Sequence, residues 1–287
     1  MPPSLDASAY HNLLRNFLDE DISTGDITTQ TTVKAARRAR GELIAKAPLV
    51  LAGIDIFLEV FRLLDSSTEV ELLAHDGDEL APGKIPARVI SSASALLSGE
   101  RVALNLLQRL SGVATLTRRF AQAIDGTGAA VLDTRKTTPG LRSLEKYAVL
   151  VGGGKSHRKD LAEAVLIKEN HIRLAGGVCA ALVAAQAARG KVAWIEIEVT
   201  NLSELREALA HNPDVILLDN MNPALTRQAV DEVRRHKGPH EIRTEASGGV
   251  TLANVRDFAD TGVDWISVGA LTHSAPAVDL SFEIEPV

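Results

Sequence analysis

The octet Asp133-Thr134-Arg135-Lys136-Thr137-Thr138-Pro139-Gly140 decides how the rest of the sequence is interpreted. The apolar run Ala129–Leu132 before it is typical of a short buried strand. Residues 141–149 after it have helical spacing, and Pro139 suits the first turn of that helix. We therefore expect the octet to be a loop at the carboxyl end of a strand, where α/β proteins bind their ligands. Its two adjacent cations favour an anionic substrate, although this stretch alone leaves a solvated turn as the alternative.

The chain beyond Gly128 alternates between strand-like and helical patterns. Helical spacing lies between most of the apolar runs. Repeated βα units with short connections indicate a parallel sheet, and six in a row favour a closed or nearly closed barrel. Upstream, the pattern predicts a long helix that starts near Leu96 and a second helix over residues 113–124. The six strand candidates are residues 130–132, 164–167, 192–199, 215–218, 241–244 and 265–268.

The first 95 residues are organised differently, as a small α/β sandwich rather than as part of a barrel. Residues 278–284 alternate like a strand and are expected to return to this N-terminal sheet. We therefore predict a sandwich domain over residues 1–112, joined by residues 274–287, and a catalytic barrel domain over residues 113–273. The elements expected in the sandwich are helices over 7–18 and 54–64 and strands over 38–46, 70–73 and 87–90.

Composition narrows the classes of function. The 287-residue chain is 45% hydrophobic, so it can bury a large core, and its formal net charge is -6 with two Trp, two Tyr and six Phe. An acidic protein with few aromatic residues lacks the surfaces that bind nucleic acid or anionic membranes. The single cysteine, Cys179, excludes an internal disulfide framework, and its apolar neighbours predict that it is buried. Since no signal peptide or membrane-spanning segment is recognisable, we expect a soluble, cytoplasmic protein.

The residues that follow each predicted strand test for a catalytic barrel, because barrel enzymes place their catalytic groups there. One group is cationic; Arg suits the recognition of carboxylate or phosphate, and Lys supplies a point charge. The second is the carboxylate pair Glu198 and Asp219, whose oxygens suit Mg²⁺. Alternation along the third strand places Glu196 and Glu198 on the same face. The cationic group consists of Arg135, Lys136, His157, Arg158 and Lys168.

Glycine-rich loops follow the last two strands. Ser247-Gly248-Gly249 and Gly269 are expected to open helices whose backbone N–H groups bind a phosphate. Each of these residues has an ordinary structural explanation when it is taken alone. Together they predict a substrate that carries phosphate, carboxylate or pyrophosphate groups and that needs a divalent cation. No convergent Ser-His-Asp triad or cysteine nucleophile is apparent, which argues against covalent catalysis.

These motifs, in this order, closely resemble the quinolinate phosphoribosyltransferase family, the decarboxylating nicotinate-nucleotide pyrophosphorylases of NAD biosynthesis. The resemblance covers nearly the whole chain, from Gly25-Asp26-Ile27-Thr28 to Val268–His273. Its most specific parts are the octet, the His157-Arg158 pair and the Lys168–His171 element. The other matching stretches are residues 100–108, 141–142, 152–154, 166–167, 196–199, 218–221 and 245–249.

The resemblance implies a fold and an assembly. The fold is an N-terminal α/β sandwich followed by an open seven-stranded α/β barrel, TIM-like and of the type II phosphoribosyltransferase kind, with one strand more than the sequence pattern predicts. The assembly is a homodimer in which the sandwich of one subunit covers the barrel mouth of the other. Arg101 would then reach into the partner's active site. Whether dimers assemble further is left open.

The same resemblance implies the reaction and its residues. Phosphoribosyl pyrophosphate would transfer its phosphoribosyl group to quinolinate, with Mg²⁺ and with loss of CO₂, to give nicotinate mononucleotide and pyrophosphate. Residues expected to hold the two carboxylates of quinolinate are Arg101, Arg135, His157, Arg158 and Lys168. Those expected to bind the 5-phosphate are Ser247, Gly248, Gly249 and Gly269. Lys136 would face the pyrophosphate, while Glu198 and Asp219 would hold Mg²⁺ or stabilise positive charge on the ribose. The expected catalytic residues are Glu198, Asp219, Lys136 and Lys168.

Two alternatives remain. A related phosphoribosyltransferase that acts on nicotinate or another pyridine acid without decarboxylation would use a similar site, although the number of cations favours a dicarboxylate. A barrel that only binds a phosphorylated ligand, as a sensor or an assembly subunit, would not need the Glu198 and Asp219 pair.

Overall fold

The computed structural model describes residue 5 and residues 10–287, and the contacts divide the chain into two units. The first unit comprises Met1–Arg118, Thr138–Gly153 and Thr272–Val287, and the second comprises Arg119–Thr137 and Gly154–Leu271. The helix expected over residues 7–18 begins outside the described residues; the helix observed there, α1, is His11–Ile22.

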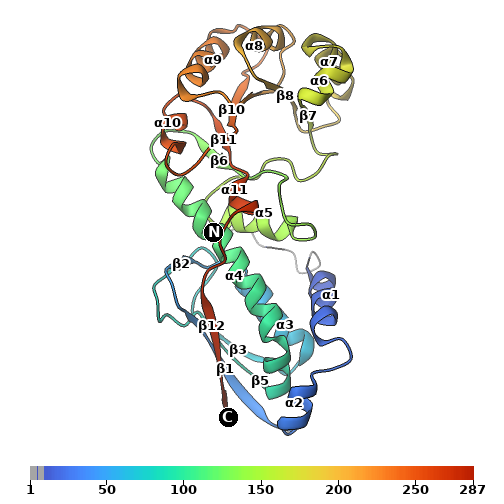
Figure 1. Cartoon of the computed structure of the whole chain (residues 1–287), viewed down its shortest axis with the longest axis vertical. Helices are drawn as coiled ribbons and strands as arrows, with labels where there is room; N and C mark the ends of the chain where they lie inside the picture. Colours follow the sequence, from blue (N-terminus) through green and yellow to red (C-terminus); the bar gives the residue numbers. More distant parts are fainter. Residues whose placement is uncertain (1–4, 6–9) are drawn as a thin grey trace. The chain divides into compact units, whose positions relative to one another are not determined.

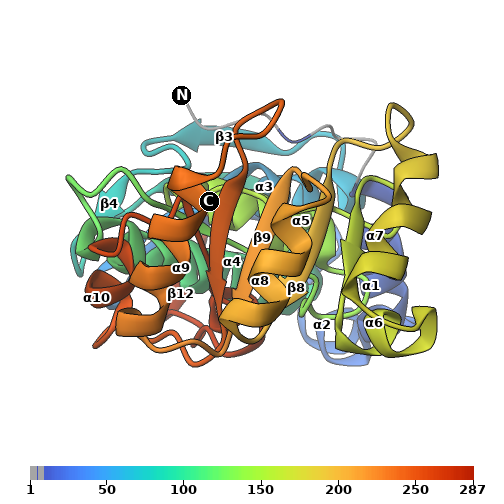
Figure 2. The ribbon, with the colours of Figure 1, turned by 90° about the horizontal axis from the view of Figure 1, so that it is seen from above.

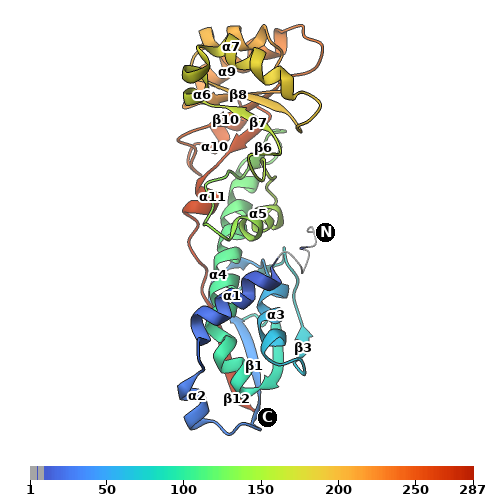
Figure 3. The same cartoon turned by 90° about the vertical axis from the view of Figure 1, so that its right-hand side faces the viewer.

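The first unit is built on a four-stranded antiparallel sheet with the order β12-β1-β5-β3. The C-terminal strand therefore pairs with the first strand, at one edge of the sheet. Helix α3 packs beside this sheet (Figure 3), and its Phe57 and Phe61 rings contact Phe282 of β12 at centroid distances of 5.5 and 5.2 Å. A side chain at Gly41 of β1 would collide with the Phe282 ring, so this position requires glycine. The elements are α2 Ile27–Thr32, β1 Arg38–Ala45, β2 Leu49–Val50, α3 Ile54–Leu64, β3 Glu69–Leu72, β4 Glu79–Leu80, β5 Ala87–Ser92, α5 Arg142–Val151 and β12 Leu280–Pro286.

Helix α4, Ala93–Ala123, corrects the sequence prediction. The pattern predicted two helices on either side of Gly112, whereas the structure has one continuous helix of 31 residues. A side chain at Gly112 would collide with the carbonyl oxygen of Pro276, so the glycine permits a close approach of two backbones rather than ending a helix. The acidic stretch 19–29 also contains the start of a helix. Helix α2 begins there, with the Asp26 carboxylate accepting from Thr29 N–H at 2.9 Å.

The second unit is built on a six-stranded parallel sheet with the order β6-β11-β10-β9-β8-β7. Helices α6, α7, α8 and α9 lie along one face of this sheet (Figures 1 and 2). The parallel α/β architecture expected from the repeated βα pattern is therefore present. The elements are β6 Ala130–Leu132, β7 Val165–Ile167, α6 Glu169–Ala175, α7 Val178–Ala185, the 3-10 helix η2 Gln186–Ala188, β8 Ile195–Val199, α8 Leu202–Leu209, β9 Val215–Asp219, α9 Pro223–Arg235, β10 Arg243–Ser247, α10 Val255–Ala259, β11 Trp265–Ser267 and α11 Ala270–His273, whose last two residues fall in the first unit.

A single residue of the loop after α5 pairs with the outer edge of β6. Lys155 forms an isolated parallel bridge with Leu132: its N–H donates to Val131 O at 2.8 Å, and its carbonyl accepts from Asp133 N–H at 3.1 Å. Among the described residues the sheet thus consists of six strands and this bridge, without a full seventh strand. The bridge nevertheless brings residues 155–158 to the carboxyl end of β6.

Two features of α6 and α7 bear on the remaining sequence predictions. Cys179 is exposed, contrary to the prediction that it is buried. Helix α7 is apolar on all sides, and the helical period turns Val178 and Leu182 inward and Cys179 outward, which composition alone could not predict. Among the described residues, no single helix is long and apolar enough to cross a membrane; by length and composition only the bent pair α6 with α7–η2 would qualify, with an angle of 92° at the break.

Candidate active site

The strand registers of the second unit place a series of polar side chains on one face of the sheet. Asp219 of β9 pairs with Ser247 of β10, and Ser247 pairs with Ser267 of β11. Glu198 of β8 pairs with Leu217, two residues before Asp219. Paired residues of adjacent strands, and residues two apart in one strand, point to the same face. The residues that share this face are Glu196, Glu198, Asp219, Glu245, Ser247 and Ser267.

Lys168 and Glu198, two of the predicted catalytic residues, are in direct contact. Lys168 follows β7, and its Nζ lies 3.2 Å from Glu198 Oε2. The lysine is half exposed, whereas the Glu198 side chain is 12% exposed. The Lys168 N–H donates to Nδ1 of His171 at 3.0 Å, so His171 helps to begin α6. The carboxyl ends of β7 and β8 thus present a cation and a carboxylate together.

The loops after β9 and β10 are locked to each other. Asn220 N–H donates to Ser247 O at 2.8 Å, and the Asn220 side-chain amide donates to Asp219 Oδ2 at 2.6 Å. Asn220 and Gly248 both have positive φ, 54° and 92°, and a side chain at Gly248 would collide with Asn220 Oδ1. Glycine at position 248 is therefore required by the conformation and by the close neighbour.

The expectation that both glycine-rich loops open helices is only half right. Gly269 directly precedes α11, but Ser247-Gly248-Gly249 is followed by a loop, and α10 begins six residues later at Val255. Gly249 also has positive φ, 65°. Two successive left-handed residues turn the backbone sharply, so any phosphate bound here would be held by loop N–H groups rather than by a helix end.

The octet is anchored at both of its ends. Asp133 is fully buried; its carboxylate accepts from His157 N–H at 2.9 Å and from Ser156 Oγ at 3.0 Å. In the first unit, Thr138 donates through N–H and Oγ1 to the buried Glu145 carboxylate, at 3.0 and 2.8 Å. Glu145 in turn pairs with Arg109 at 2.8 Å. The first residue of the octet is thus structural within the second unit, and Thr138 is anchored within the first unit.

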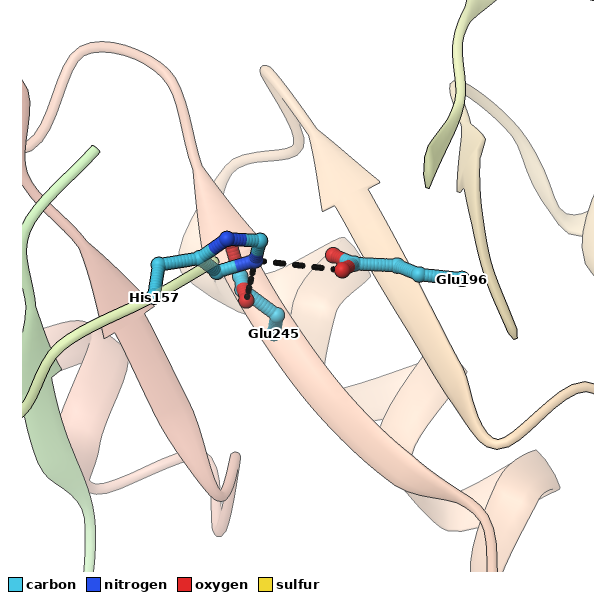
Figure 4. Close-up of side chains that lie close together, drawn as sticks. All are labelled: His157, Glu196 and Glu245. Carbon is cyan, nitrogen blue, oxygen red and sulfur yellow. Dashed lines mark hydrogen bonds and ion pairs between the residues drawn. The ribbon is translucent and has the colours of Figure 1, made fainter. Parts of the chain in front are cut away.

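His157, Glu196 of β8 and Glu245 of β10 form a buried cluster (Figure 4). Nε2 of His157 is 3.1 Å from Glu196 Oε2 and 3.3 Å from Glu245 Oε2. Trp194 Nε1 donates to the same Glu196 oxygen at 2.9 Å, and its ring packs edge-on against His157. Glu196 and Glu245 belong to β8 and β10, which are separated by β9, so their meeting on one imidazole shows that the sheet curves inward.

The hydrogen bonds locate the ring proton of His157. A backbone N–H can only donate, so Nδ1 accepts from Arg158 N–H at 2.8 Å and carries no proton. The ring proton is therefore on Nε2, toward the carboxylates. Burial opposes a charge on His157, whereas the hydrogen bonds to Glu196 and Glu245 favour it and raise the pKa of His157. Burial, and then the charge of Glu196, also raise the pKa of Glu245.

Although the three side chains are of metal-ligating types, with ligand atoms within 4.8 Å of one another, a protonated Nε2 has no lone pair for a metal. The donor set that fits Mg²⁺ is instead Glu198 and Asp219, two carboxylates on one face of the sheet at the strand ends.

Arg135 and Arg158 form the strongest anion-binding feature. The Nε atom of each guanidinium is buried and has no hydrogen-bond partner among the described residues. Arg158 itself is 6% exposed, and its Nη1 donates to Ala164 O at 2.9 Å. Burial, and then the charge of the nearby Arg135, lower the pKa of Arg158, yet a guanidinium stays protonated. Two neighbouring cations with unused buried donors require an anion.

The structure places the predicted residues as follows. Arg101 lies in the first unit on α4, where its side chain is 66% exposed and 3.3 Å from Glu100. All the other predicted site residues lie in the second unit, on or just after the carboxyl ends of strands or the Lys155 bridge. These are Arg135, Lys136, His157, Arg158, Lys168, Glu198, Asp219, Ser247, Gly248, Gly249 and Gly269.

Sequence reasoning did not assign roles to Trp194, Glu196 and Glu245. The sequence did indicate that Glu196 has a polar partner, because an acidic residue between Ile195 and Ile197 in a buried strand requires one. The partner was not predictable, because it arrives on a loop from the far side of the sheet.

Comparison with known proteins agrees with this geometry. A family model for the N-terminal domain of quinolinate phosphoribosyl transferase matches residues 26–111, and one for its C-terminal domain matches residues 113–283. The chain belongs to the quinolinate phosphoribosyltransferase family. The resemblance found in the sequence motifs is thereby confirmed.

Relatives of this phosphoribosyltransferase include two bacterial proteins of nearly the same length. One, from Bacillus subtilis, is named probable nicotinate-nucleotide pyrophosphorylase (carboxylating); it is 44% identical over 272 residues, covering 95% of this chain and 92% of its own. The nicotinate-nucleotide pyrophosphorylase (carboxylating) of Mycobacterium leprae is 42% identical over 96% of this chain and 97% of its own. Among solved structures, NadC from Streptococcus pyogenes has a TM-score of 0.93 and 37% identity, covering 99% of both chains.

Proposed function

We propose that this protein is a decarboxylating quinolinate phosphoribosyltransferase. It transfers the phosphoribosyl group of phosphoribosyl pyrophosphate to the ring nitrogen of quinolinate, and releases pyrophosphate, CO₂ and nicotinate mononucleotide. The family membership supports the reaction type, and the observation that carries the substrate is the pair Arg135 and Arg158. Their unused buried Nε donors suit an anion with two neighbouring carboxylates on one rigid ring.

The substrates divide between two sets of residues. Arg135 and Arg158 hold the quinolinate carboxylates, together with Lys168, which already contacts one carboxylate in the protein. His157 contributes through Arg158, whose backbone N–H donates to its Nδ1. The loop from Ser247 to Gly249, with Gly269 before α11, offers backbone N–H groups to the 5-phosphate. Lys136, exposed on the octet, faces the pyrophosphate.

Glu198 and Asp219 act on the ribose side. As quinolinate nitrogen attacks C1 and pyrophosphate departs, the ribose acquires oxocarbenium character, and two carboxylates on the same sheet face stabilise that positive charge. They would also hold Mg²⁺, which when bound neutralises charge on the pyrophosphate. The hydrogen bond from Asn220 to Asp219 fixes one carboxylate, and the Lys168 contact fixes the other.

Decarboxylation follows from the product of the first step. N-ribosylation converts the ring into a pyridinium, whose positive charge accepts the electron pair left when the neighbouring carboxylate departs as CO₂. Arg135 and Arg158 keep the dicarboxylate in place until that step, and the burial of Arg158 limits the access of water to the carboxylate it holds.

The assembly and architecture implied by the resemblance are part of the proposal. The catalytic unit is an open seven-stranded barrel in which the Lys155 bridge stands for the seventh strand. The protein is a cytoplasmic homodimer with domains over residues 1–112 and 113–273, and Arg101 serves the partner's site. An exposed stripe of α4 that contains Leu97, Arg101 and Asn105 supports the availability of this arginine.

The test is product formation by the purified enzyme. Quinolinate, phosphoribosyl pyrophosphate and Mg²⁺ should give equal amounts of CO₂ and nicotinate mononucleotide, measured by ¹⁴CO₂ release from carboxyl-labelled quinolinate and by chromatography. Nicotinate in place of quinolinate should give little or no product. Turnover of nicotinate without turnover of quinolinate would refute the proposal, and binding of phosphoribosyl pyrophosphate without turnover of either acid would favour a sensor.

A further inference from the structure

The His157 ring has no nitrogen left for a ligand. Its Nδ1 accepts from Arg158 N–H, and its Nε2 lies against Glu196 and Glu245. Its backbone N–H is also occupied, by Asp133 at 2.9 Å. Direct binding of a substrate carboxylate through either ring nitrogen would require one of these contacts to break. The ring therefore acts inside the protein, as a link between the carboxylate cluster and Arg158.

Arg158 is the residue that this link supports. Its backbone N–H is fixed by His157 Nδ1 and its Nη1 by the carbonyl of Ala164, while its buried Nε has no partner among the described residues. Arg158 is thus held at two points, one on its backbone and one on its guanidinium, and the Nε donor is left unused. A small rotation of the His157 ring would move the Arg158 backbone and the free donor with it.

Glu196 is the residue that prevents such a rotation. It makes the shorter of the two contacts to Nε2 and is itself fixed by Trp194 Nε1, at 2.9 Å. Its side chain is fully buried.

We propose that Glu196 is a positioning residue for substrate selection: through His157 it orients Arg158 toward one of the two quinolinate carboxylates. The inference rests on the proposed function and assigns to Glu196 a role that neither the motifs nor its strand position indicates. The alternative is that the cluster only stabilises the interior of the sheet. The two roles differ in which kinetic constant depends on Glu196.

Steady-state kinetics of Glu196→Gln separate these roles. The variant keeps the shape of the side chain but loses the anion that receives the Nε2–H and Nε1–H donors. We expect KM for quinolinate to rise about tenfold, the loss expected for one weakened charge-assisted hydrogen bond, with kcat changed less than about threefold. KM for phosphoribosyl pyrophosphate should stay within about twofold, which also excludes an indirect effect on the neighbouring Glu198.

A double variant tests whether Glu196 acts through the ring. In His157→Asn, the amide oxygen can still accept from Arg158 N–H, but the Nε2 atom that contacts Glu196 is removed. If Glu196 works through His157, adding Glu196→Gln to His157→Asn should raise KM for quinolinate no further. If Glu196→Gln does not fold, Trp194→Phe, which removes only the indole donor, should show the same selective rise in smaller measure.

The outcomes are distinct. Wild-type enzyme that fails to convert quinolinate refutes the proposed function, and the inference with it. Wild-type activity with an unchanged KM for quinolinate in Glu196→Gln, or an equal rise in both KM values, refutes the inference alone. A lowered melting temperature of Glu196→Gln without any change in its kinetics also refutes the inference. The inference is refuted as well if the rises in KM for quinolinate caused by Glu196→Gln and His157→Asn multiply in the double variant.

Discussion

Replacing Arg135 by alanine should remove most of the turnover of quinolinate without weakening the fold. Arg135 contributes a buried Nε that has no protein partner among the described residues, so its removal breaks no hydrogen bond through that atom. It also removes the charge that lowers the pKa of Arg158. The unfolding free energy should therefore stay level or rise, by up to about 1 kcal/mol at the effective dielectric constant of partly buried charges.

The loss of activity follows from the hydrogen bonds that the substrate would lose. A charge-assisted hydrogen bond contributes about 1.5–3 kcal/mol, and a bidentate guanidinium–carboxylate pair contains two. Loss of about 3 kcal/mol or more lowers kcat/KM for quinolinate by about a hundredfold or more. Arg135→Lys keeps the charge but not the planar fork, so it should fall between the wild type and the alanine variant, about tenfold down.

The assay is ¹⁴CO₂ release at several quinolinate concentrations, paired with urea unfolding of the same preparations. The combination of lost activity with undiminished stability distinguishes a substrate clamp from a structural ion pair. Arg135→Ala with kcat/KM within about threefold of the wild type would show that the argument from the unused donors is wrong. So would a variant that loses stability and activity in parallel.

Three further predictions follow from other parts of the structure. An equimolar hybrid of Arg101→Ala and Arg135→Ala subunits should recover about a quarter of the wild-type sites, because half of the dimers carry one intact shared site; no recovery would contradict the shared site. Gly248→Ala should raise KM for phosphoribosyl pyrophosphate and not for quinolinate, because the added methyl group collides with Asn220 and strains the backbone; equal KM values would count against the phosphate loop. Hydrogen bonds from the Ser67 hydroxyl and then Ser92 N–H lower the pKa of Asp65, so the carboxylate stabilises the fold above the pKa of the unfolded state and this stabilisation is lost on acidification. In Asp65→Asn, the unfolding free energy measured in urea should therefore decrease less between about pH 5 and pH 2 than in the wild type. An unchanged pH dependence would refute this prediction.

Much of the second unit was predictable from the sequence because strand and helix alternate with different hydrophobic periods. All six predicted strands are present, although several are shorter than expected, as β8 is at Ile195–Val199. The positions of Lys168, Glu198 and Asp219 at strand ends were predictable for the same reason. Parallel strands bring their carboxyl ends to one edge, whatever connects them.

The features that the sequence did not predict depend on contacts between distant backbones. Gly112 looked like a boundary between helices, but it lies inside α4 because Pro276 approaches it, some 160 residues further along the chain. Cys179 looked buried because an all-apolar helix does not show which side faces the protein. The link from Glu196 to Arg158 was hidden because it requires the 155–158 loop to return beside β6.

The cluster around His157 also determines when the protein can first bind its substrate during folding. Asp133, His157, Glu196 and Glu245 come from four separate parts of the second unit, and the last of them is on β10. Contacts so far apart in sequence form late, after the loops between them have closed. A nascent chain that has not yet completed β10 lacks Glu245, one of the two carboxylates that contact the imidazole. The chain can then bind quinolinate only late in folding. Because quinolinate binds only the completed sheet, it would stabilise the folded enzyme relative to partly folded chains.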